Sequence, residues 1–329
     1  MTAPMDVTGG DTQATPAVVE GAGGQAIQGR SLGQIAWMRL KRDKVALAGG
    51  LIVIFLILVA VFAPVIAGAF GQDPTQFNSD LIDSSTMAPK TGTGISADHL
   101  FGIEPVNGRD IFSRVVYGAR ISLLIAFLAT LLSVVIGTLL GVTAGYFGGL
   151  VDSIISKAMD VFLAFPILVF AIALAGIVPD SAFGLTGDTL RVSLLVFIIG
   201  FFNWPYIGRI IRGQTLSLRE REFVDAARSL GARGPYIIFR ELLPNLVAPI
   251  LIYSTLLIPT NVLFEAALSF LGVGVRPPTP TWGGMLSDAV RFYTIPHFMF
   301  FPGMAIFITV LAFNLFGDGL RDALDPKAR

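Results

Sequence analysis

Long uncharged apolar runs constrain this chain more than any other feature. Residues 45–70 contain no charged side chain, and a helix over this run would be about 39 Å long at about 1.5 Å per residue. That length crosses a hydrocarbon core of about 30 Å with room for tilt. Because lipid cannot satisfy free backbone groups, and no run alternates with a two-residue period, each run is expected to be a helix. Five further runs lie near residues 118–145, 153–178, 192–212, 246–271 and 298–317.

The sequence therefore predicts an all-α integral membrane protein with six transmembrane helices. Prolines inside the runs (Pro166, Pro205, Pro249, Pro259 and Pro302) are compatible with this prediction where neighbouring helices cover the freed backbone groups.

Composition supports a membrane protein and removes several other classes. Hydrophobic residues make up 53% of the 329 residues and charged residues only 14%, which is far from a typical soluble domain. The net charge is zero, so no nucleic-acid partner is expected. The absence of cysteine removes disulfides, thiolate metal sites and cysteine nucleophiles. His99 and His297 lie far apart in the sequence and are expected to be ordinary loop residues, so no metal site is predicted.

The basic residues predict on which side each loop lies. Five of them fall within residues 30–44, and seven arginines fall within residues 209–240. With six crossings, the N-terminal part, the 213–245 loop and the C-terminus share one side, which the positive-inside rule assigns to the cytoplasm. Residues 71–117 then form a long extracytoplasmic loop, and residues 272–297 form a second one.

Composition also sets the remaining boundaries. Residues 1–30 are rich in Gly, Ala, Thr and Gln without an apolar period, which predicts a disordered cytoplasmic tail and no signal peptide. Residues 31–70 combine a basic interfacial anchor that contains Trp37 with the first transmembrane helix. Residues 118–320 form the transmembrane core, and residues 321–329 form a cytoplasmic C-terminus.

The arginine-rich loop contains a predicted amphipathic helix over residues 217–231. Ser217 is expected to cap its start, with Glu220 completing a capping box, and Gly231 is expected to end it in the left-handed conformation. Pro244 suits the start of the next membrane helix. One apolar face, with small residues on it, would let another protein approach closely, although a solvated loop helix has the same pattern. The predicted apolar face consists of Phe223, Ala226, Ala227 and Leu230.

These residues resemble the EAA loop of ABC importer permeases, and other blocks agree with the C-type permease subunit of dipeptide and oligopeptide importers. The resemblance covers roughly residues 31–327 and departs from the family pattern at Asp225 and Glu241, which stand where Glu and often His are found. It rests on residues 225–227, Gly231, 242–244, 62–66, 108–122, 267–283 and 315–326.

The resemblance implies a type I importer permease fold in a bacterial inner membrane, with both termini cytoplasmic. It also implies three kinds of partner besides lipid: a second, homologous permease, two cytoplasmic ATP-binding subunits that hold ATP and Mg²⁺, and an extracytoplasmic substrate-binding protein. Within the 213–245 coupling loop, the residues implied to couple to the ATPase are Arg219, Glu222, Asp225, Ala226, Ala227, Gly231 and Pro244.

Motifs for chemistry are missing from this sequence. It has no phosphate-binding Gly-x-x-x-x-Gly-Lys-Ser/Thr loop, no His-Glu-x-x-His helix and no Gly-x-Ser-x-Gly elbow. No catalytic residue and no cofactor are therefore assigned to the chain, and energy is expected to come from a partner or from an ion gradient.

Two polar residues inside the fifth apolar run are candidates for the translocation path or gate. A charged Glu265 near Asn261 costs roughly 2.5–3.5 kcal/mol at the centre of a membrane helix. It could line the path, or it could pair with another subunit or stay protonated in the protein interior. Three glycines with a four-residue spacing predict close helix packing, with a pore lining as the second interpretation: Gly137, Gly141 and Gly145.

Two other functions remain open on the residues alone. An ion-coupled secondary transporter would need no ATPase, although it would be expected to show internal repeats or several intramembrane titratable groups. A membrane scaffold or receptor without transport is the second alternative. Within the resembled family, the sequence does not distinguish dipeptides, oligopeptides, nickel chelates and glutathione as substrates.

Overall fold

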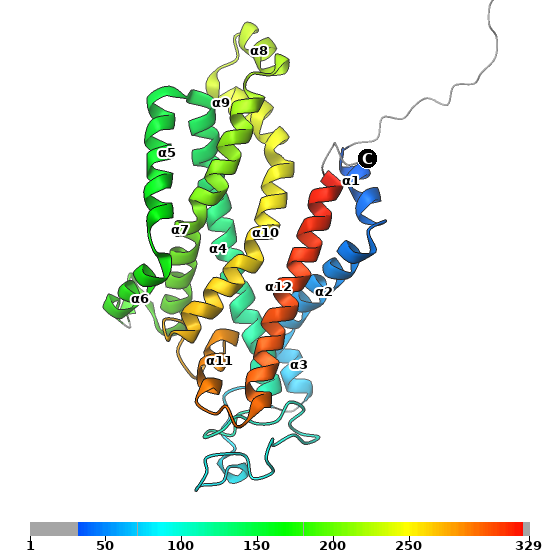
Figure 1. Cartoon of the computed structure of the whole chain (residues 1–329), viewed down its shortest axis with the longest axis vertical. Coiled ribbons are helices and arrows are strands. Elements are labelled where there is room, and N and C mark those ends of the chain that lie inside the picture. The colour runs from blue at the N-terminus through cyan, green and yellow to red at the C-terminus, as the bar shows by residue number, and fades with distance from the viewer. Residues whose placement is uncertain (1–31, 71, 180, 325–329) are drawn as a thin grey trace, which may run out of the picture.

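The computed structural model describes residues 32–70, 72–179 and 181–324, and these are mostly helical (Figure 1). The expected disordered tail, residues 1–30, and the last five residues of the expected C-terminal segment lie outside the described residues.

Most of the predicted spans are present as long helices. Five helical segments are long and apolar enough to cross a membrane, and a bent pair of helices gives a sixth if it is counted as one span. The five contain α2 (Lys44–Val61), α4 (Ile111–Phe147), α7 (Gly187–Leu218), α10 (Leu243–Phe270) and α12 (Pro296–Leu324). The bent pair is α5 (Gly149–Ala164) and α6 (Ile167–Ile177).

Two of the predicted single helices are broken. The run at 153–178 bends by 76° between α5 and α6, because Pro166 has no N–H to donate and pushes Phe165 into an extended conformation (ψ 128°). The expectation that Pro166 would be accommodated inside a single helix is therefore wrong. The first run divides at Phe62 into α2 and the short α3 (Ala63–Ala69), which has a proline in its first turn. The other four prolines named above lie within helices.

The glycine stripe of α4 forms a close helix contact, as the four-residue spacing predicted. A Cβ atom added at Gly137 would lie 2.7 Å from the carbonyl oxygen of Trp204, and one at Gly141 would lie 2.6 Å from the carbonyl oxygen of Gly208. At Gly145 the nearest atom is the Cβ of Thr215, also at 2.6 Å. Because all three partners lie on α7, the backbones of α4 and α7 run side by side at a distance that only glycine permits.

One end of the bundle is covered by the 72–110 segment and by a helix that sequence reasoning did not predict, α11 (Trp282–Val290). Trp282 is buried and donates from Nε1 to the carbonyl oxygen of Val115 at 2.9 Å, so it fixes α11 to the first turns of α4. The small elements here and elsewhere are η1 (Ser79–Leu81), β1 (Ser181–Ala182) and β2 (Leu185–Thr186).

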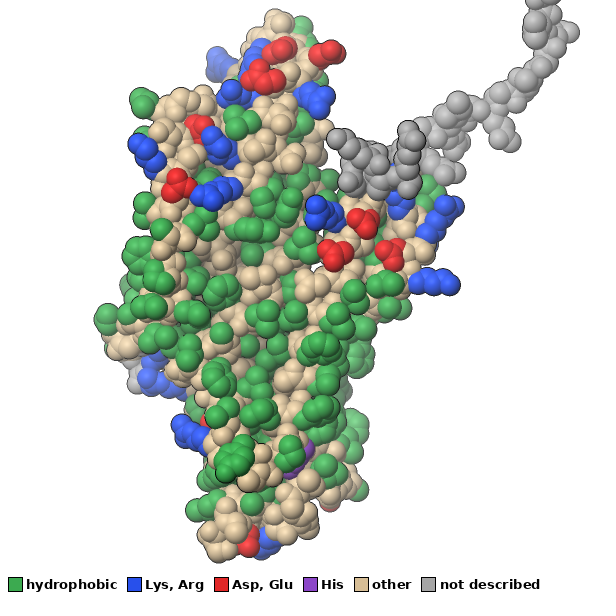
Figure 2. Space-filling model, in the orientation of Figure 1, with side chains coloured by type: hydrophobic (Ala, Val, Ile, Leu, Met, Phe, Trp, Pro, Cys, Tyr) green, Lys and Arg blue, Asp and Glu red, His purple; other side chains and the backbone are tan. Residues whose placement is uncertain are grey.

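The opposite end carries the arginine-rich loop. Figure 1 shows α8 (Glu222–Ser229) at the top of the molecule, at the same end as α1 (Leu32–Leu40) and the last turns of α12, and the 72–110 segment at the bottom. Figure 2 shows charged side chains gathered around α8 and α1, and a broad apolar surface over the length between the two ends. The three segments that the charge pattern assigned to one side therefore share one end of the bundle.

Candidate coupling site

The loop helix is shorter than the sequence suggested. It spans Glu222–Ser229, with Arg221 before it and no side-chain cap, whereas α7 continues to Leu218. The prediction that Ser217 caps this helix, with Glu220 in a capping box, is wrong: Ser217 lies in the last turn of α7. Close packing of α7 on α4 as far as Thr215 keeps that segment helical and overrides the local capping signal.

The end of α8 is as predicted. Gly231 adopts the left-handed conformation with φ of +84°, and its N–H donates to the carbonyl oxygen of Arg228 at 2.9 Å. The N–H of Ala232 donates to the carbonyl oxygen of Ala227 at 3.0 Å. This pair of bonds is the Schellman arrangement, which stops the helix and turns the chain sharply.

Apolar residues anchor α8 to the membrane helices, and Val224 is the most deeply buried of them. Val224 is 0% exposed and packs in a cluster with Ile211 of α7 and Leu246 of α10. The same cluster includes Leu242, at the end of the π-helical turn η2 (Ile237–Leu242), which follows the short α9 (Gly234–Tyr236). Burying one valine side chain contributes roughly 1.5–3 kcal/mol, so α8 is held on the ends of α7 and α10 and does not hang free.

The neighbouring face of α8 borders an open groove of about 650 Å³. Ala226 and Ala227 supply small side chains, and Leu230 at the rim is 89% exposed. An exposed leucine beside alanines and a glycine gives a concave apolar surface that a partner's backbone can approach closely. The groove is lined by Phe223, Ala226, Ala227, Leu230, Gly231, Ala232, Arg233, Tyr236 and Glu241.

The structure brings together only part of the implied coupling set. Ala226, Ala227 and Gly231 share the groove, and Glu222 and Asp225 are exposed on α8 but do not line it. The Asp225 carboxylate accepts from Arg228 Nη1 at 3.1 Å. Pro244 is exposed in the first turn of α10.

Arg219 has a different place from the rest. It follows α7 directly, and its Nη1 donates to the carbonyl oxygen of Gly145 near the end of α4 at 3.0 Å. About two turns earlier, Arg212 Nη2 donates to the Asp152 carboxylate of α5 at 2.7 Å. Sequence reasoning did not assign Asp152 a role, because the pairing depends on a contact between segments 60 residues apart.

Both candidate path residues are buried within this chain. Asn261 is 0% exposed; its Nδ2 donates to Thr130 Oγ1 at 2.8 Å, and its Oδ1 accepts from Asn203 Nδ2 at 3.0 Å. Glu265 is also 0% exposed, and its Oε1 accepts from Ser269 Oγ at 2.7 Å. In this conformation neither side chain faces the chain's surface.

Long apolar helices, a coupling-loop helix on their ends and an apolar groove beside it define a multi-pass permease of the ABC importer class. Residues 137–329 match the family of binding-protein-dependent transport system inner membrane components, and residues 31–89 match the N-terminal transmembrane domain of oligopeptide transport permease C. The chain belongs to this family and is a C-type permease within it.

Individual relatives agree over most of the chain. It is 41% identical over 299 residues to the dipeptide transport system permease protein DppC of Alkalihalophilus pseudofirmus, which covers 89% of this chain and 90% of the relative. It is also 41% identical over 294 residues to the glutathione transport system permease protein GsiD of Escherichia coli O157:H7, with the same coverage. Neither of these two relatives is named for ion-coupled transport.

A solved structure supports the fold. The MetNI methionine ABC transporter in an inward-facing conformation aligns with a TM-score of 0.53 at 18% identity, over 65% of this chain and 98% of the matched chain. At this identity the likeness shows the type I permease fold alone.

Proposed function

We propose that this permease forms half of the translocation pathway of an ATP-driven importer for short peptides. The support is the 41% identity to permeases named for dipeptide and glutathione transport, both of which are peptide substrates. In this proposal α8 and both termini lie in the cytoplasm of a bacterial cell, and the 72–110 segment lies outside, in accordance with the arginine distribution.

The complex that this function requires contains several other chains. A second, homologous permease completes the pathway, two cytoplasmic subunits bind and hydrolyse ATP with Mg²⁺, and a binding protein delivers the peptide from outside. This chain supplies no phosphate-binding loop, so its contribution is mechanical: it converts movement of the ATPases into opening and closing of the membrane helices.

The groove beside α8 is the observation that carries the coupling role. Its floor consists of Ala226, Ala227 and Gly231, which are the residues that a partner helix or loop can approach most closely. Val224, which lies one turn before Ala227 on α8, is anchored among residues of α7 and α10. A force applied in the groove is therefore transmitted directly to two membrane helices.

The implied coupling residues then divide by role. Ala226, Ala227 and Gly231 shape the contact surface, while Glu222 and Asp225 offer exposed charges beside it. Arg219 acts as a positioning residue, because its guanidinium is used to join the end of α7 to that of α4. Pro244 starts α10. Asn261 and Glu265 hold helices together in the conformation described here and reach the pathway only if the helices separate.

A pair of arginine substitutions on α8 tests the coupling surface. In the reconstituted complex, Ala227→Arg places a large charged side chain in the groove, so we expect ATP hydrolysis to persist while transport falls at least tenfold. Ser229→Arg adds the same side chain to an exposed position of α8 outside the groove, and should retain most of the transport. Equal transport by the two variants, measured as ATP-dependent peptide accumulation in vesicles, would contradict the proposed docking surface.

A further inference from the structure

A second concave site lies at the opposite end of the molecule from α8. Residues of the 72–110 segment, the turn before α11, α11 itself and the start of α12 surround a pocket of about 580 Å³. This volume is within the range of roughly 300–1,000 Å³ that small-molecule sites occupy. Neither the relatives' names nor the coupling role assigns it a ligand.

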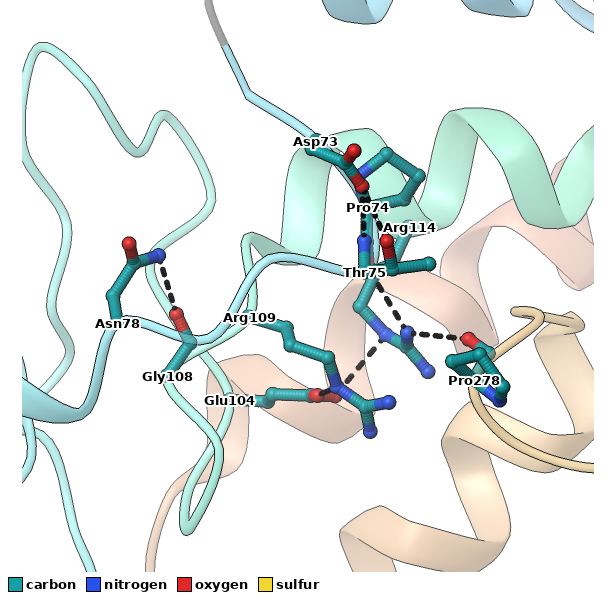
Figure 3. Close-up of polar contacts among 9 residues, drawn as sticks. All are labelled: Asp73, Pro74, Thr75, Asn78, Glu104, Gly108, Arg109, Arg114 and Pro278. Carbon is teal, nitrogen blue, oxygen red and sulfur yellow. Dashed lines mark hydrogen bonds and ion pairs between the residues drawn. The ribbon is translucent and has the colours of Figure 1, made fainter.

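Two buried arginines and one buried glutamate form the polar part of this region (Figure 3). Arg109 Nε donates to Glu104 Oε1, and Arg114 Nε lies 3.2 Å from Glu104 Oε2. Arg114 Nη1 also donates to the carbonyl oxygens of Pro74 and Pro278, each at 3.1 Å. Arg114 is therefore committed to joining the 72–110 segment to the turn before α11.

Arg109 is differently placed, because it lines the pocket itself. The residue is 4% exposed, yet its two terminal guanidinium nitrogens have no hydrogen-bond partner among the described residues. Burial, followed by repulsion from Arg114, lowers the pKa of Arg109 to about 10, against the opposing attraction of Asp288. It remains a cation at neutral pH, and Arg109 and Arg114, both buried, share the buried carboxylate of Glu104.

The walls around this cation are largely apolar. The ring centroid of Phe77 lies 5.8 Å from Arg109 Cζ. The apolar lining also includes Phe292, Phe298, Val106 and three prolines. A guanidinium with free donors matches the two oxygens of a carboxylate, and the surrounding rings suit an apolar group next to it. We propose that this pocket binds a small carboxylate that carries an apolar substituent.

Asp288 on α11 provides a way to distinguish an anionic ligand from a cationic one. Asp288 is half-buried and lines the same pocket, and its negative charge attracts the Arg109 cation. It opposes an anion and would favour a cation. Removing its charge should therefore strengthen the binding of a carboxylate, whereas it would weaken the binding of an ammonium group.

The pocket faces the extracytoplasmic side in the orientation proposed above, and a peptide terminus is a carboxylate of the required kind. Only the suggestion that the natural ligand is a peptide terminus rests on the proposed function. Binding itself requires neither ATPase nor transport, so a failure to bind and a failure to transport can be told apart.

The test is a titration of the full-length chain in lipid nanodiscs with N-acetyl-phenylalanine, followed by saturation-transfer NMR of the ligand. We expect N-acetyl-phenylalanine amide, which lacks the carboxylate, to bind about tenfold more weakly. Arg109→Gln should weaken binding of the acid by about tenfold, and Asp288→Asn should strengthen it severalfold. Lys90→Gln, a charge removal in the same segment but outside the pocket lining, should change nothing.

Equal binding of the acid and the amide would overturn the proposal, as would an Asp288→Asn variant that binds the acid more weakly. A folded Arg109→Gln variant with unchanged affinity would do the same. Because Arg109 also contacts Glu104, the Arg109→Gln variant can fail to fold. Arg291, an exposed residue that lines the pocket, then provides a second test. We expect Arg291→Gln to weaken binding of the acid severalfold, and an unchanged affinity would count against the carboxylate site.

Discussion

The contact between α4 and α7 gives a prediction whose sign can be worked out from one distance. A Cβ atom at Gly141 would lie 2.6 Å from the carbonyl oxygen of Gly208, a backbone atom that cannot rotate away. Ordinary contact begins near 3.4 Å, so Gly141→Ala forces the two helices apart. Overpacking of this kind costs about 1–3 kcal/mol, which exceeds the gain of about 0.5–1 kcal/mol from replacing glycine by alanine in a helix.

The same substitution at Gly213 is the matched control. Gly213 is exposed in the last turns of α7, and an added Cβ would meet no heavy atom within 4 Å. Gly213→Ala should therefore keep the whole gain in helix propensity, about 1 kcal/mol. The two variants differ from the native chain by one methyl group each, and the structure predicts opposite effects on stability.

Thermal unfolding in lipid nanodiscs, followed by tryptophan fluorescence, measures the difference. Trp204 is buried at the α4–α7 contact and reports on it. At roughly 2–4 °C per kcal/mol, we expect Gly141→Ala to unfold several degrees below the native protein and Gly213→Ala a few degrees above it. If Gly141→Ala unfolds at the same temperature as Gly213→Ala, or higher, the close backbone contact is absent.

Three further substitutions test other parts of the argument. Arg219→Ala removes the bond to Gly145, and should loosen coupling by raising ATP hydrolysis per peptide transported severalfold while ATPase binding, measured by co-purification, stays intact; lost co-purification would instead make Arg219 a direct contact. Trp282→Phe keeps one aromatic ring, but removes the donor to the Val115 carbonyl and part of a fully buried indole. It should lower the unfolding free energy by about 1–2 kcal/mol for the lost hydrogen bond and further for the void left behind; an unchanged unfolding temperature would contradict this. Glu265→Leu removes a fully buried acid that accepts a hydrogen bond, and we expect assembled complex and transport to fall in parallel, since a selective loss of transport would assign Glu265 to the pathway.

The membrane helices could be predicted because lipid imposes a simple rule on composition. Apolar runs located the spans, although α4 begins and α12 ends about two turns beyond the predicted runs. The glycines at 137, 141 and 145 indicated the close packing now seen between α4 and α7. The left-handed conformation of Gly231 could be predicted as well, because a helix end with this geometry strongly favours glycine over other residues.

The errors arose where local and tertiary forces disagree. Ser217 carries a good capping signal, yet α7 remains helical through it because α4 packs alongside. Pro166 breaks its run, whereas Pro205 lies within α7, and which outcome occurs depends on neighbouring helices that the sequence does not display. Helix α11 was missed because it is short and is held by Trp282 against a segment far away in the sequence.

The proposed coupling also depends on how the membrane helices are joined beyond α8. Asn261 of α10 bonds to Thr130 of α4 at 2.8 Å and to Asn203 of α7 at 3.0 Å, so one amide links three helices. Sliding any of them past the others would leave donors and acceptors unpaired in apolar surroundings, which is costly. Val224 anchors α8 on α7 and α10. A displacement of α8 should therefore move α4, α7 and α10 together, and the helices that give way are those outside this hydrogen-bonded set.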